Sequence, residues 1–282
     1  MSEFTAGPPI HAAVINLARH PERLECFMAA ADRAGLTVER IDAIDANDDT
    51  VRAQIEGIRH EGSKLSNAEA ACILSHRKAW QWLLDSQDSF LAVFEDDVYL
   101  SEDMRQLLSP DLLTADLDLV KLEIPTGKVS YCRKAYAGFL GRRLHRLLTK
   151  ANGSGGYIVS RKCAQRLLEV SGDCSEPVDF ILFDDKSPIW RDFSVLQVVP
   201  AACIQDTILS KINGVSERFS SAIAMDSRDE QAQRKIQNKK NKKQVSFKKL
   251  RRYLHCIRNG ANPFKYKQLV PWDLGFPGTH EQ

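Results

Sequence analysis

Residues 90–100 read Phe-Leu-Ala-Val-Phe-Glu-Asp-Asp-Val-Tyr-Leu, five apolar residues followed by three consecutive carboxylates. A short continuous apolar run is typical of a strand buried on both faces of a parallel sheet. Because unpaired carboxylates are costly in such surroundings, we expect Glu95, Asp96 and Asp97 where the strand leaves the sheet. Ligands bind at that edge of open α/β sheets, and crowded carboxylates suit Mg²⁺ or Mn²⁺. The alternative interpretation is a solvated acidic turn after a core strand.

Strand-like and helix-like patterns alternate on both sides of this stretch. Pro21 suits the first turn of a helix that Gly35 would end, and Ser66 and Glu69 form a capping box before a second helix. A third helix passes through Leu167. The expected strands are 12–17, 38–44, 90–94, 117–122, 156–160 and 195–199. This alternation predicts an α/β fold with a mostly parallel central sheet flanked by helices and joined by right-handed crossovers.

Charge divides the chain into two parts. Residues 225–260 contain twelve Lys or Arg and three acidic residues, a net charge of +9, so the other residues carry −7 of the total of +2. We therefore expect a catalytic domain over 1–215 and a basic, partly helical or disordered C-terminal extension over 216–282. The seven cysteines form no Cys-x-x-Cys pair, which favours a reducing cytoplasm. No secretory leader or long apolar run is evident.

Several familiar α/β sites do not fit this sequence. The phosphate-binding pattern G-x-x-x-x-G-K-[ST] does not occur. The glycine-rich stretch 153–156 precedes an expected strand, whereas a dinucleotide site needs glycines between a strand and the helix whose N-terminus holds the pyrophosphate. A receiver domain would need an acidic pair after the first strand, where this chain has Asn16 and Leu17. The interpretation that survives is a divalent cation bridging a nucleotide diphosphate.

Five short motifs occur in the order of a known family. They are N-L-x-R-x-x-E-R at 16–23, L-S-H at 74–76, E-D-D at 95–97, a G-x-x-Y-x-x-S-like strand at 155–160, and P-V-D at 177–179. On these motifs the chain resembles glycosyltransferase family 25, the bacterial lipopolysaccharide (LPS) and lipooligosaccharide glycosyltransferases related to the collagen galactosyltransferases. The resemblance extends over roughly residues 12–206. Each motif is weak alone, and their common order makes the resemblance specific.

The resemblance implies a GT-A type fold and a UDP-sugar donor, commonly UDP-galactose. It implies Mn²⁺ or Mg²⁺ held through Asp97, and transfer with inversion to an oligosaccharide or lipid-linked acceptor. A metal and cationic side chains would neutralise the leaving diphosphate, and one general base would take the acceptor's proton. That base is Asp179 or Asp184, and Asp206 is a further candidate for the metal site. By resemblance, the residues that contact the UDP-sugar donor are Asn16, Arg19, Arg23, Ser75, His76, Glu95, Asp96, Gly155 and Gly156.

Each of these assignments has a structural alternative. Arg19 and Arg23 follow the first expected strand, yet either could be a solvated surface cation. His76 shares an apolar helical stripe with Ile73 and Trp80, so a core histidine competes with a donor contact. The glycines at 155 and 156 either allow close approach of the donor sugar or shape a turn. An Arg- and Lys-containing insertion at 125–150 is expected to form part of the acceptor wall.

The basic segment 234–258 places cations and apolar residues at roughly helical spacing. One interpretation is a solvated tail, and the other is a surface that rests on an anionic membrane, on the inner face of the cytoplasmic membrane. Nucleic acid is an unfavourable partner because aromatics are few in the segment and the rest of the chain is acidic. A catalytically inactive nucleotide-sugar-binding assembly partner is the alternative to an enzyme.

Overall fold

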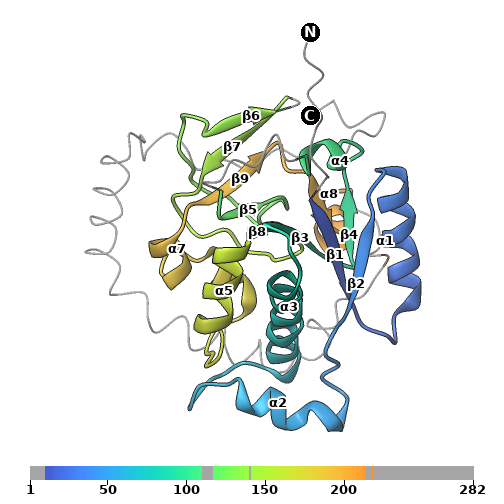
Figure 1. Ribbon diagram of the computed structural model, residues 1–282, viewed down its shortest axis with the longest axis vertical. Helices are drawn as coiled ribbons and strands as arrows, with labels where there is room; N and C mark the ends of the chain where they lie inside the picture. Colours follow the sequence, from blue (N-terminus) through green and yellow to red (C-terminus); the bar gives the residue numbers. More distant parts are fainter. Residues whose placement is uncertain (1–9, 110–116, 140, 214–217, 219–282) are drawn as a thin grey trace.

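An eight-stranded sheet forms the centre of the molecule, with strand order β2-β1-β3-β8-β5-β9-β7-β6 (Figure 1). This computed structural model describes residues 10–109, 117–139, 141–213 and 218. The strands are β1 (His11–Asn16), β2 (Val38–Asp42), β3 (Phe90–Glu95), β5 (Leu119–Lys121), β6 (Ala137–Phe139), β7 (Arg142–Arg146), β8 (Gly156–Ser160) and β9 (Val195–Val199). A second, two-stranded sheet pairs β4 (Val98–Leu100) with β10 (Cys203–Gln205) in antiparallel orientation.

Most strands of the central sheet run in one direction. β1 is parallel to both β2 and β3, and β5 is parallel to β9. β8 lies between β3 and β5 and is antiparallel to both, and β7 is antiparallel to β9 and β6. The described strands β7 and β8 therefore run against the rest. The α/β class with a mostly parallel central sheet flanked by helices, expected from the sequence, is confirmed.

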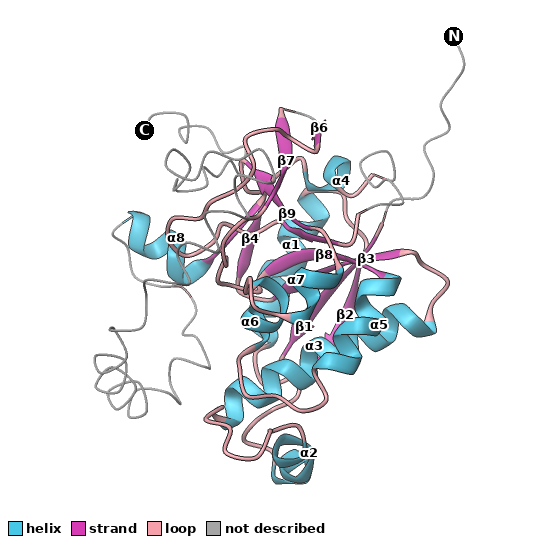
Figure 2. Cartoon of the chain, turned by 90° about the vertical axis from the view of Figure 1, so that its left-hand side faces the viewer, coloured by secondary structure: helices cyan, strands magenta, loops and turns pink. Residues whose placement is uncertain are grey.

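Two hydrophobic clusters cover the two faces of the sheet. Along β1, Ala13 and Ile15 contribute to one cluster, and Ala12 and Val14 to the other, as expected for a strand buried on both sides. Helices α3 and α5 lie side by side on the first face, and α1 covers the second (Figures 1 and 2). The helices are α1 (Pro21–Arg33), α2 (Arg52–Gly57), α3 (Asn67–Asp85), α4 (Met104–Leu107), α5 (Arg161–Val170), α6 (Val178–Phe183), α7 (Pro188–Asp192) and α8 (Asp206–Asn213), with a 3-10 turn at Asp49–Val51.

Local sequence signals account for the longer elements. Pro21 occupies the first turn of α1, and Gly35, at φ 69°, follows the end of that helix. Ser66 and Glu69 form the expected capping box at the start of α3. The segment 125–150, for which the sequence predicts no conformation, contains the hairpin of β6 and β7. Such short elements depend on pairing with distant strands and carry little signal of their own.

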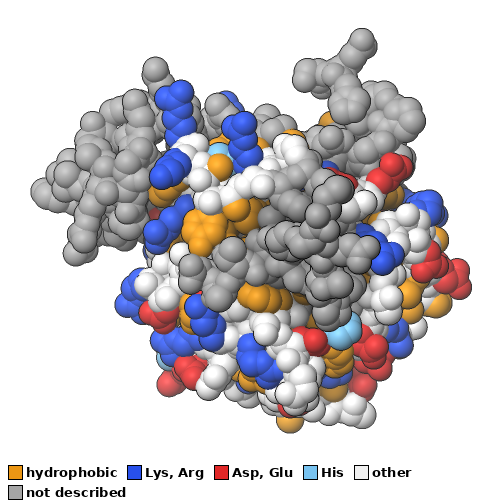
Figure 3. Space-filling model, turned by 45° about the horizontal axis from the view of Figure 1, so that its top comes forward, with side chains coloured by type: hydrophobic (Ala, Val, Ile, Leu, Met, Phe, Trp, Pro, Cys, Tyr) orange, Lys and Arg blue, Asp and Glu red, His pale blue; other side chains and the backbone are white. Residues whose placement is uncertain are grey.

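The described surface carries charges of both signs. On the face shown in Figure 3, Lys and Arg side chains are interspersed with Asp and Glu side chains. Within the described residues, no helix combines the length and the apolar character needed to cross a bilayer. The basic segment 234–258, and almost all of the expected extension 216–282, lie outside the described residues, so both stay predictions.

Candidate active site

The carboxyl ends of the parallel strands β1, β3 and β5 bring polar residues to one edge of the sheet. Asn16 ends β1, Glu95 ends β3, and Lys121 ends β5. Asp96 and Asp97 form the turn between β3 and β4, so the acidic triplet stands where the apolar run leaves the sheet. This is the placement that the sequence predicts for residues 95–97.

A buried network joins Asp96 to the first helix. Asp96 accepts hydrogen bonds from Asn16 Nδ2 (2.7 Å) and from Arg23 Nη1 (2.9 Å). Asn16 also donates to His20 O (3.0 Å) and accepts from Arg40 Nε (3.1 Å). Burial raises the pKa of Asp96, although Arg23 and Asn16 act to lower it. Arg23 is therefore a buried partner of Asp96 and not a solvated surface cation.

Glu95 lies next to this network with different partners. Its carboxylate accepts from Ser154 Oγ (2.5 Å) and from Gln205 Nε2 (3.4 Å), and His76 Nε2 lies 3.4 Å from Oε1. Burial acts to raise the pKa of Glu95, but His76, Ser154 and Lys121 together hold it below the usual range. Glu95 is thus an ionised carboxylate close to the sheet edge.

A chain of buried aromatic side chains fixes His76. Trp80 Nε1 donates to Tyr157 Oη (2.9 Å), and that oxygen lies 2.8 Å from His76 Nδ1. All three side chains are fully buried. Because the indole only donates, the Tyr157 hydroxyl satisfies Trp80 Nε1 by accepting from it and satisfies His76 Nδ1 by donating to it. In that arrangement a neutral His76 carries its proton on Nε2, the atom nearest Glu95.

Asp97 is buried without a full set of partners. Its Oδ1 has no hydrogen-bond partner among the described residues. Burial, followed by the negative charge of Glu95, raises the pKa of Asp97 well above its ordinary value. Its backbone carbonyl accepts from Asp206 N (2.8 Å), which joins the turn to the start of α8. A nearby cation would therefore favour the ionised form of Asp97 at this position.

Two charged residues that the sequence reasoning did not single out lie beside the triplet. Lys121 and Glu123 are completely buried, and Lys121 Nζ donates to Glu123 Oε2 (2.9 Å). Lys121 Nζ also donates to Gly153 O and lies 4.4 Å from the centroid of the Phe183 ring. Burial raises the pKa of Glu123, and its Oε1 has no partner among the described residues. The sequence does contain a signal for these two residues. Lys121 and Glu123 stand at the end of an apolar strand, as Glu95, Asp96 and Asp97 stand at the end of β3.

The loop before β8 requires its glycines for space and conformation. Gly153 has φ +95°, and a Cβ there would lie 2.6 Å from Glu123 Oε2. A Cβ on Gly155 would lie 2.8 Å from Val98 Cγ1, and one on Gly156 would collide with Cys203. Close packing thus explains Gly155 and Gly156 without a ligand. Contact of either glycine with a donor sugar stays a prediction.

The two candidate bases lie at different ends of α6. Asp179, in the first turn, accepts from Gly153 N (3.2 Å). Burial raises the pKa of Asp179, and Glu95 raises it further, while Gly153 and Lys121 act to lower it. Asp184 follows the helix, and its Oδ1 accepts from Lys186 N (2.9 Å). Asp179 therefore belongs to the group around the glycine loop, and Asp184 is tied to the turn that follows α6.

Arg19 and Ser75 have local partners. Arg19 forms an ion pair with Asp45 and is about one-third exposed. Ser75 is buried, donates to Ala71 O (2.7 Å) and accepts from Ile44 N (2.8 Å), which ties α3 to the segment after β2. Ser75 therefore stabilises the packing of α3, and Arg19 is a partly exposed residue paired with Asp45.

The residues near this edge include two kinds of possible cation ligand. Asp97 and Glu123 each have one carboxylate oxygen without a partner among the described residues, and Mg²⁺ and Mn²⁺ prefer such hard oxygen ligands. Cys72, His76 and Glu95 place one ligand atom each within 4.8 Å of one another, a set that suits a softer ion such as Zn²⁺. Burial raises the pKa of the Cys72 thiol well above its usual range, which disfavours the thiolate ligand. Metal binding by Asp97 therefore stays a prediction, and Cys72, His76 and Glu95 form the one three-residue ligand group found among the described residues.

Comparisons with known proteins identify the family of this chain. The profile of glycosyltransferase family 25 (LPS biosynthesis protein) matches residues 10–182. The chain therefore belongs to glycosyltransferase family 25. It is 30% identical over 230 residues to the lacto-N-neotetraose biosynthesis glycosyltransferase LgtB of Neisseria gonorrhoeae, across 76% of this chain and 81% of that protein. It is 25% identical over 207 residues to the lipooligosaccharide biosynthesis protein lic2B of Haemophilus influenzae, across 68% and 75% of the two chains.

Solved structures show more distant likenesses. A UDP-glucose pyrophosphorylase complexed with UDP-glucose superimposes with a TM-score of 0.37 and 8% identity, over 67% of this chain and 90% of that one. A glycosyltransferase involved in glycosylation of the major capsid of PBCV-1 gives a TM-score of 0.30 and 6% identity, over 58% and 65%. The family assignment rests on the sequence matches.

Proposed function

We propose that this glycosyltransferase moves a hexose, galactose from UDP-galactose, onto a sugar of an LPS or lipooligosaccharide core, with inversion and with the help of a divalent cation. The observation that carries the proposal is the buried carboxylate of Asp97, whose Oδ1 has no partner among the described residues and which lies beside Glu95 at the carboxyl edge of the sheet. Such an edge is where α/β sheets bind nucleotides. The names of the relatives, which refer to lacto-N-neotetraose and lipooligosaccharide biosynthesis, support an oligosaccharide acceptor.

In the proposed reaction, Asp179 is the general base. The acceptor hydroxyl oxygen forms a bond to the anomeric carbon of the donor sugar while its proton passes to the Asp179 carboxylate. The bond from that carbon to the diphosphate oxygen breaks, and UDP leaves with the electron pair. One displacement from the opposite side inverts the anomeric centre. Burial raises the pKa of Asp179, which brings a carboxylate closer to the range in which it accepts a proton efficiently.

The other residues hold the donor site in place. Mg²⁺ or Mn²⁺ held by Asp97 would neutralise the negative charge that develops on UDP. We propose that Glu95 accepts hydrogen bonds from donor hydroxyls, because Ser154 and His76 keep it ionised and oriented. The Asn16–Arg23–Asp96 network fixes the turn that carries Asp97, so its residues act on the donor through that turn.

The test is a screen of UDP-sugars with a lipooligosaccharide-derived acceptor, in Mn²⁺, in Mg²⁺ and in excess EDTA. We expect turnover with UDP-galactose that requires the metal and a product of inverted anomeric configuration. Asp97→Ala should bind UDP without metal dependence and transfer no sugar. Glu56→Gln, an exposed acid on α2, is the matched control and should match the wild type. Donor binding without turnover for every sugar and acceptor would instead identify an inactive nucleotide-sugar-binding protein.

A further inference from the structure

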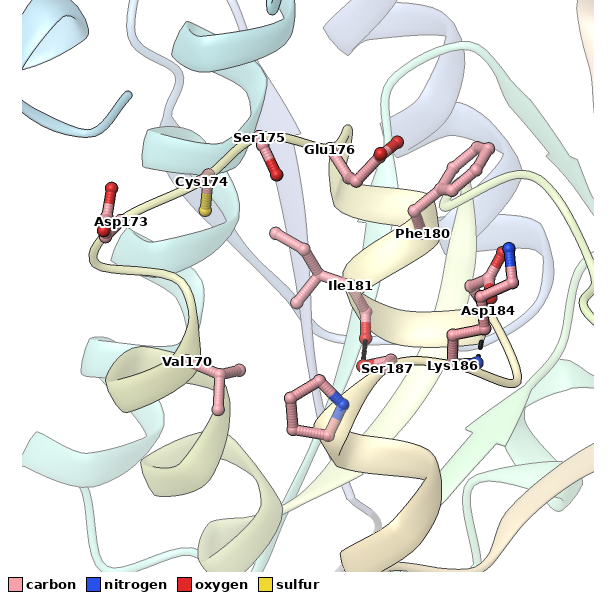
Figure 4. A pocket seen from close by; sticks show the side chains of 11 residues that line it. Val170, Asp173, Cys174, Ser175, Glu176, Phe180, Ile181, Asp184, Lys186 and Ser187 are labelled. Carbon is pink, nitrogen blue, oxygen red and sulfur yellow. Dashed lines mark hydrogen bonds between the residues drawn. The ribbon is translucent and has the colours of Figure 1, made fainter. Parts of the chain in front are cut away.

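A cavity lies on the outer side of α6, between the end of α5 and the start of α7 (Figure 4). Its volume is about 260 Å³. That is just below the ~300–1,000 Å³ typical of small-molecule pockets, a size that suits a ligand of about one sugar ring. We call it the α6 cavity. Its lining includes Val170, Glu176, Phe180, Ile181, Asp184 and Lys186.

The α6 cavity combines an apolar wall with a polar rim. Figure 4 shows Ile181 in the middle of the cavity, with Val170 below it and Ser175 and Glu176 above. A pyranose ring has the same two-sided character, because its C–H groups form apolar patches and its hydroxyls project from the edge. Binding sites for small molecules commonly pair apolar walls with a few polar groups that fix orientation.

Asp184 is the polar group best placed to bind in this cavity. Its side chain lines the cavity although the residue is only 6% exposed. Its Oδ1 accepts from Lys186 N. A carboxylate has about four lone-pair sites on its two oxygens, so the group can accept from a further donor in the cavity. A sugar hydroxyl supplies that donor without a net charge.

The charge of the lining restricts the ligand further. Asp173, Glu176 and Asp184 are acidic, whereas Lys186 is the basic member. Asp173 Oδ2 lies 2.8 Å from His60 Nδ1. Like charges at short range disfavour binding, so a phosphorylated or carboxylated sugar is a poor ligand for this lining. An uncharged sugar meets no such penalty.

One wall of the α6 cavity comes from the helix that also carries the proposed base. Asp179 and Phe180 are consecutive residues of α6; the first accepts from Gly153 N, and the second lines the cavity. Lys150 Nζ lies 4.6 Å from the centroid of the Phe180 ring, so the segment that leads to the glycine loop also contacts this wall. The proposed base and one wall of the α6 cavity therefore belong to the same short helix.

We propose that the α6 cavity is an acceptor subsite that binds an uncharged sugar ring of the acceptor oligosaccharide, adjacent to the sugar that receives the hexose. Asp184 and Glu176 accept hydrogen bonds from its hydroxyls, and Ile181 and Val170 contact its C–H face. This inference rests on the proposed function, and it assigns to Asp184 a role in binding in place of a role as base.

The first test compares acceptors on the full-length protein. An uncharged di- or trisaccharide should have a lower KM than the corresponding monosaccharide, and the same oligosaccharide phosphorylated on the second sugar should lose that advantage. Asp184→Asn keeps the shape and the bond from Lys186 N, and it should raise the oligosaccharide KM about tenfold, or ~1.4 kcal/mol, with little change in kcat. Glu176→Lys should reduce the discrimination against the phosphorylated acceptor. Glu56→Gln should change none of these values.

The second test does not depend on turnover. Saturation-transfer NMR with the uncharged oligosaccharide should show binding to the wild type and weaker binding to Asp184→Asn and Glu176→Lys. If no donor supports transfer but this binding pattern holds, the proposed reaction fails while the subsite stands. Unchanged oligosaccharide KM and unchanged binding in both variants would overturn the subsite. A loss of kcat without a change of KM in Asp184→Asn would also overturn it and return Asp184 to consideration as the base.

Discussion

The backbone N–H of Gly153 donates a hydrogen bond to Asp179 Oδ2 over 3.2 Å, so the loop before β8 holds the first turn of α6. The same loop accepts from Lys121 Nζ through Gly153 O and donates from Gly155 N to Glu123 Oε2 (2.9 Å). The proposed base and the buried ion pair therefore share one short segment. A displacement of this loop would disturb both together.

Substitution of Asp179 should separate chemistry from binding. Asp179→Asn keeps the acceptor for Gly153 N but cannot take a proton, so we expect turnover to fall by about 10²–10⁴-fold. The affinity for UDP and for Mn²⁺ should stay close to the wild-type value. Steady-state kinetics and titration calorimetry measure the two quantities. If Asp184→Asn gives this pattern and Asp179→Asn does not, the two roles must be exchanged.

The pH dependence of kcat/KM should report the same carboxyl. The base must be ionised, and burial holds the pKa of Asp179 above the usual aspartate range. Activity should therefore fall on acidification at a higher pH than an exposed aspartate would give. In Asp179→Asn the residual activity should lose this acidic limb. An unchanged acidic limb in the variant would assign the ionisation to another group.

The burial of Asp97 predicts a gain of stability when its charge is removed. Because the pKa of Asp97 is raised in the folded protein, the contribution of this group to stability is fully present below the ordinary carboxyl pKa and is lost as pH rises through the raised value. At neutral pH in EDTA, Asp97→Asn should melt a few degrees higher than the wild type, since about 1 kcal/mol corresponds to roughly 2–4 °C. Differential scanning calorimetry measures this.

Two comparisons make the Asp97 prediction specific. Mn²⁺ should raise the melting temperature of the wild type and leave that of Asp97→Asn unchanged. Asp49→Asn changes a carboxylate whose side chain is 84% exposed and should behave like the wild type with and without metal. A variant at Asp97 that melts lower in EDTA, or that Mn²⁺ still stabilises, would contradict the assignment.

The buried hydroxyl of Tyr157 should matter for both stability and donor binding. Tyr157→Phe leaves Trp80 Nε1 and His76 Nδ1 without their shared partner, which should lower the free energy of unfolding by about 1–3 kcal/mol. Because His76 then loses its orientation toward Glu95, the KM for the donor should rise as well. Tyr136→Phe, at an exposed tyrosine, is the matched control. Equal urea midpoints for the two variants would refute the network.

Local signals in the sequence predict the elements that depend on neighbours in the chain. The apolar run 90–94 followed by Glu95 predicts both a buried strand and its functional end, because burial and charge are incompatible within one stretch. The capping box of Ser66 and Glu69 is equally local, and it starts α3 as expected. The motifs then identify the family over most of the described chain.

Features that depend on distant contacts are not predictable in this way. Lys121 is buried because Gly153 O and Glu123 satisfy it, and the loop that supplies Gly153 lies some thirty residues away. The sequence leaves Asp179 and Asp184 open as the base and favours Asp179 because it closely follows Pro177. The fold gives the two carboxylates different surroundings, with Gly153 N bonded to Asp179 and the α6 cavity beside Asp184, and the choice of base stays a prediction.

The basic segment 234–258 supports a prediction that is independent of the described residues. If the segment rests on an anionic membrane, each engaged cation contributes about 1 kcal/mol of attraction to the surface. Salt screens this attraction, so binding to anionic liposomes should weaken steeply as the salt concentration rises. Replacing Lys239, Lys240, Lys242 and Lys243 with Gln should release the protein while sparing transfer to a lipid-free acceptor. Co-sedimentation measures the binding. Binding that does not change with salt, or no binding at low salt, would contradict membrane attachment and favour the interpretation of the segment as a solvated tail.

The most direct test of the account is the rate of galactose transfer from UDP-galactose to a lipid-free lipooligosaccharide acceptor, measured for wild type and Asp97→Ala with Mn²⁺ and with excess EDTA. The account predicts rapid transfer by the wild type in Mn²⁺, loss of that transfer in EDTA, and no transfer by Asp97→Ala in either condition. Full wild-type activity in EDTA, or full activity of Asp97→Ala, would contradict the claim that Asp97 holds a cation needed for transfer.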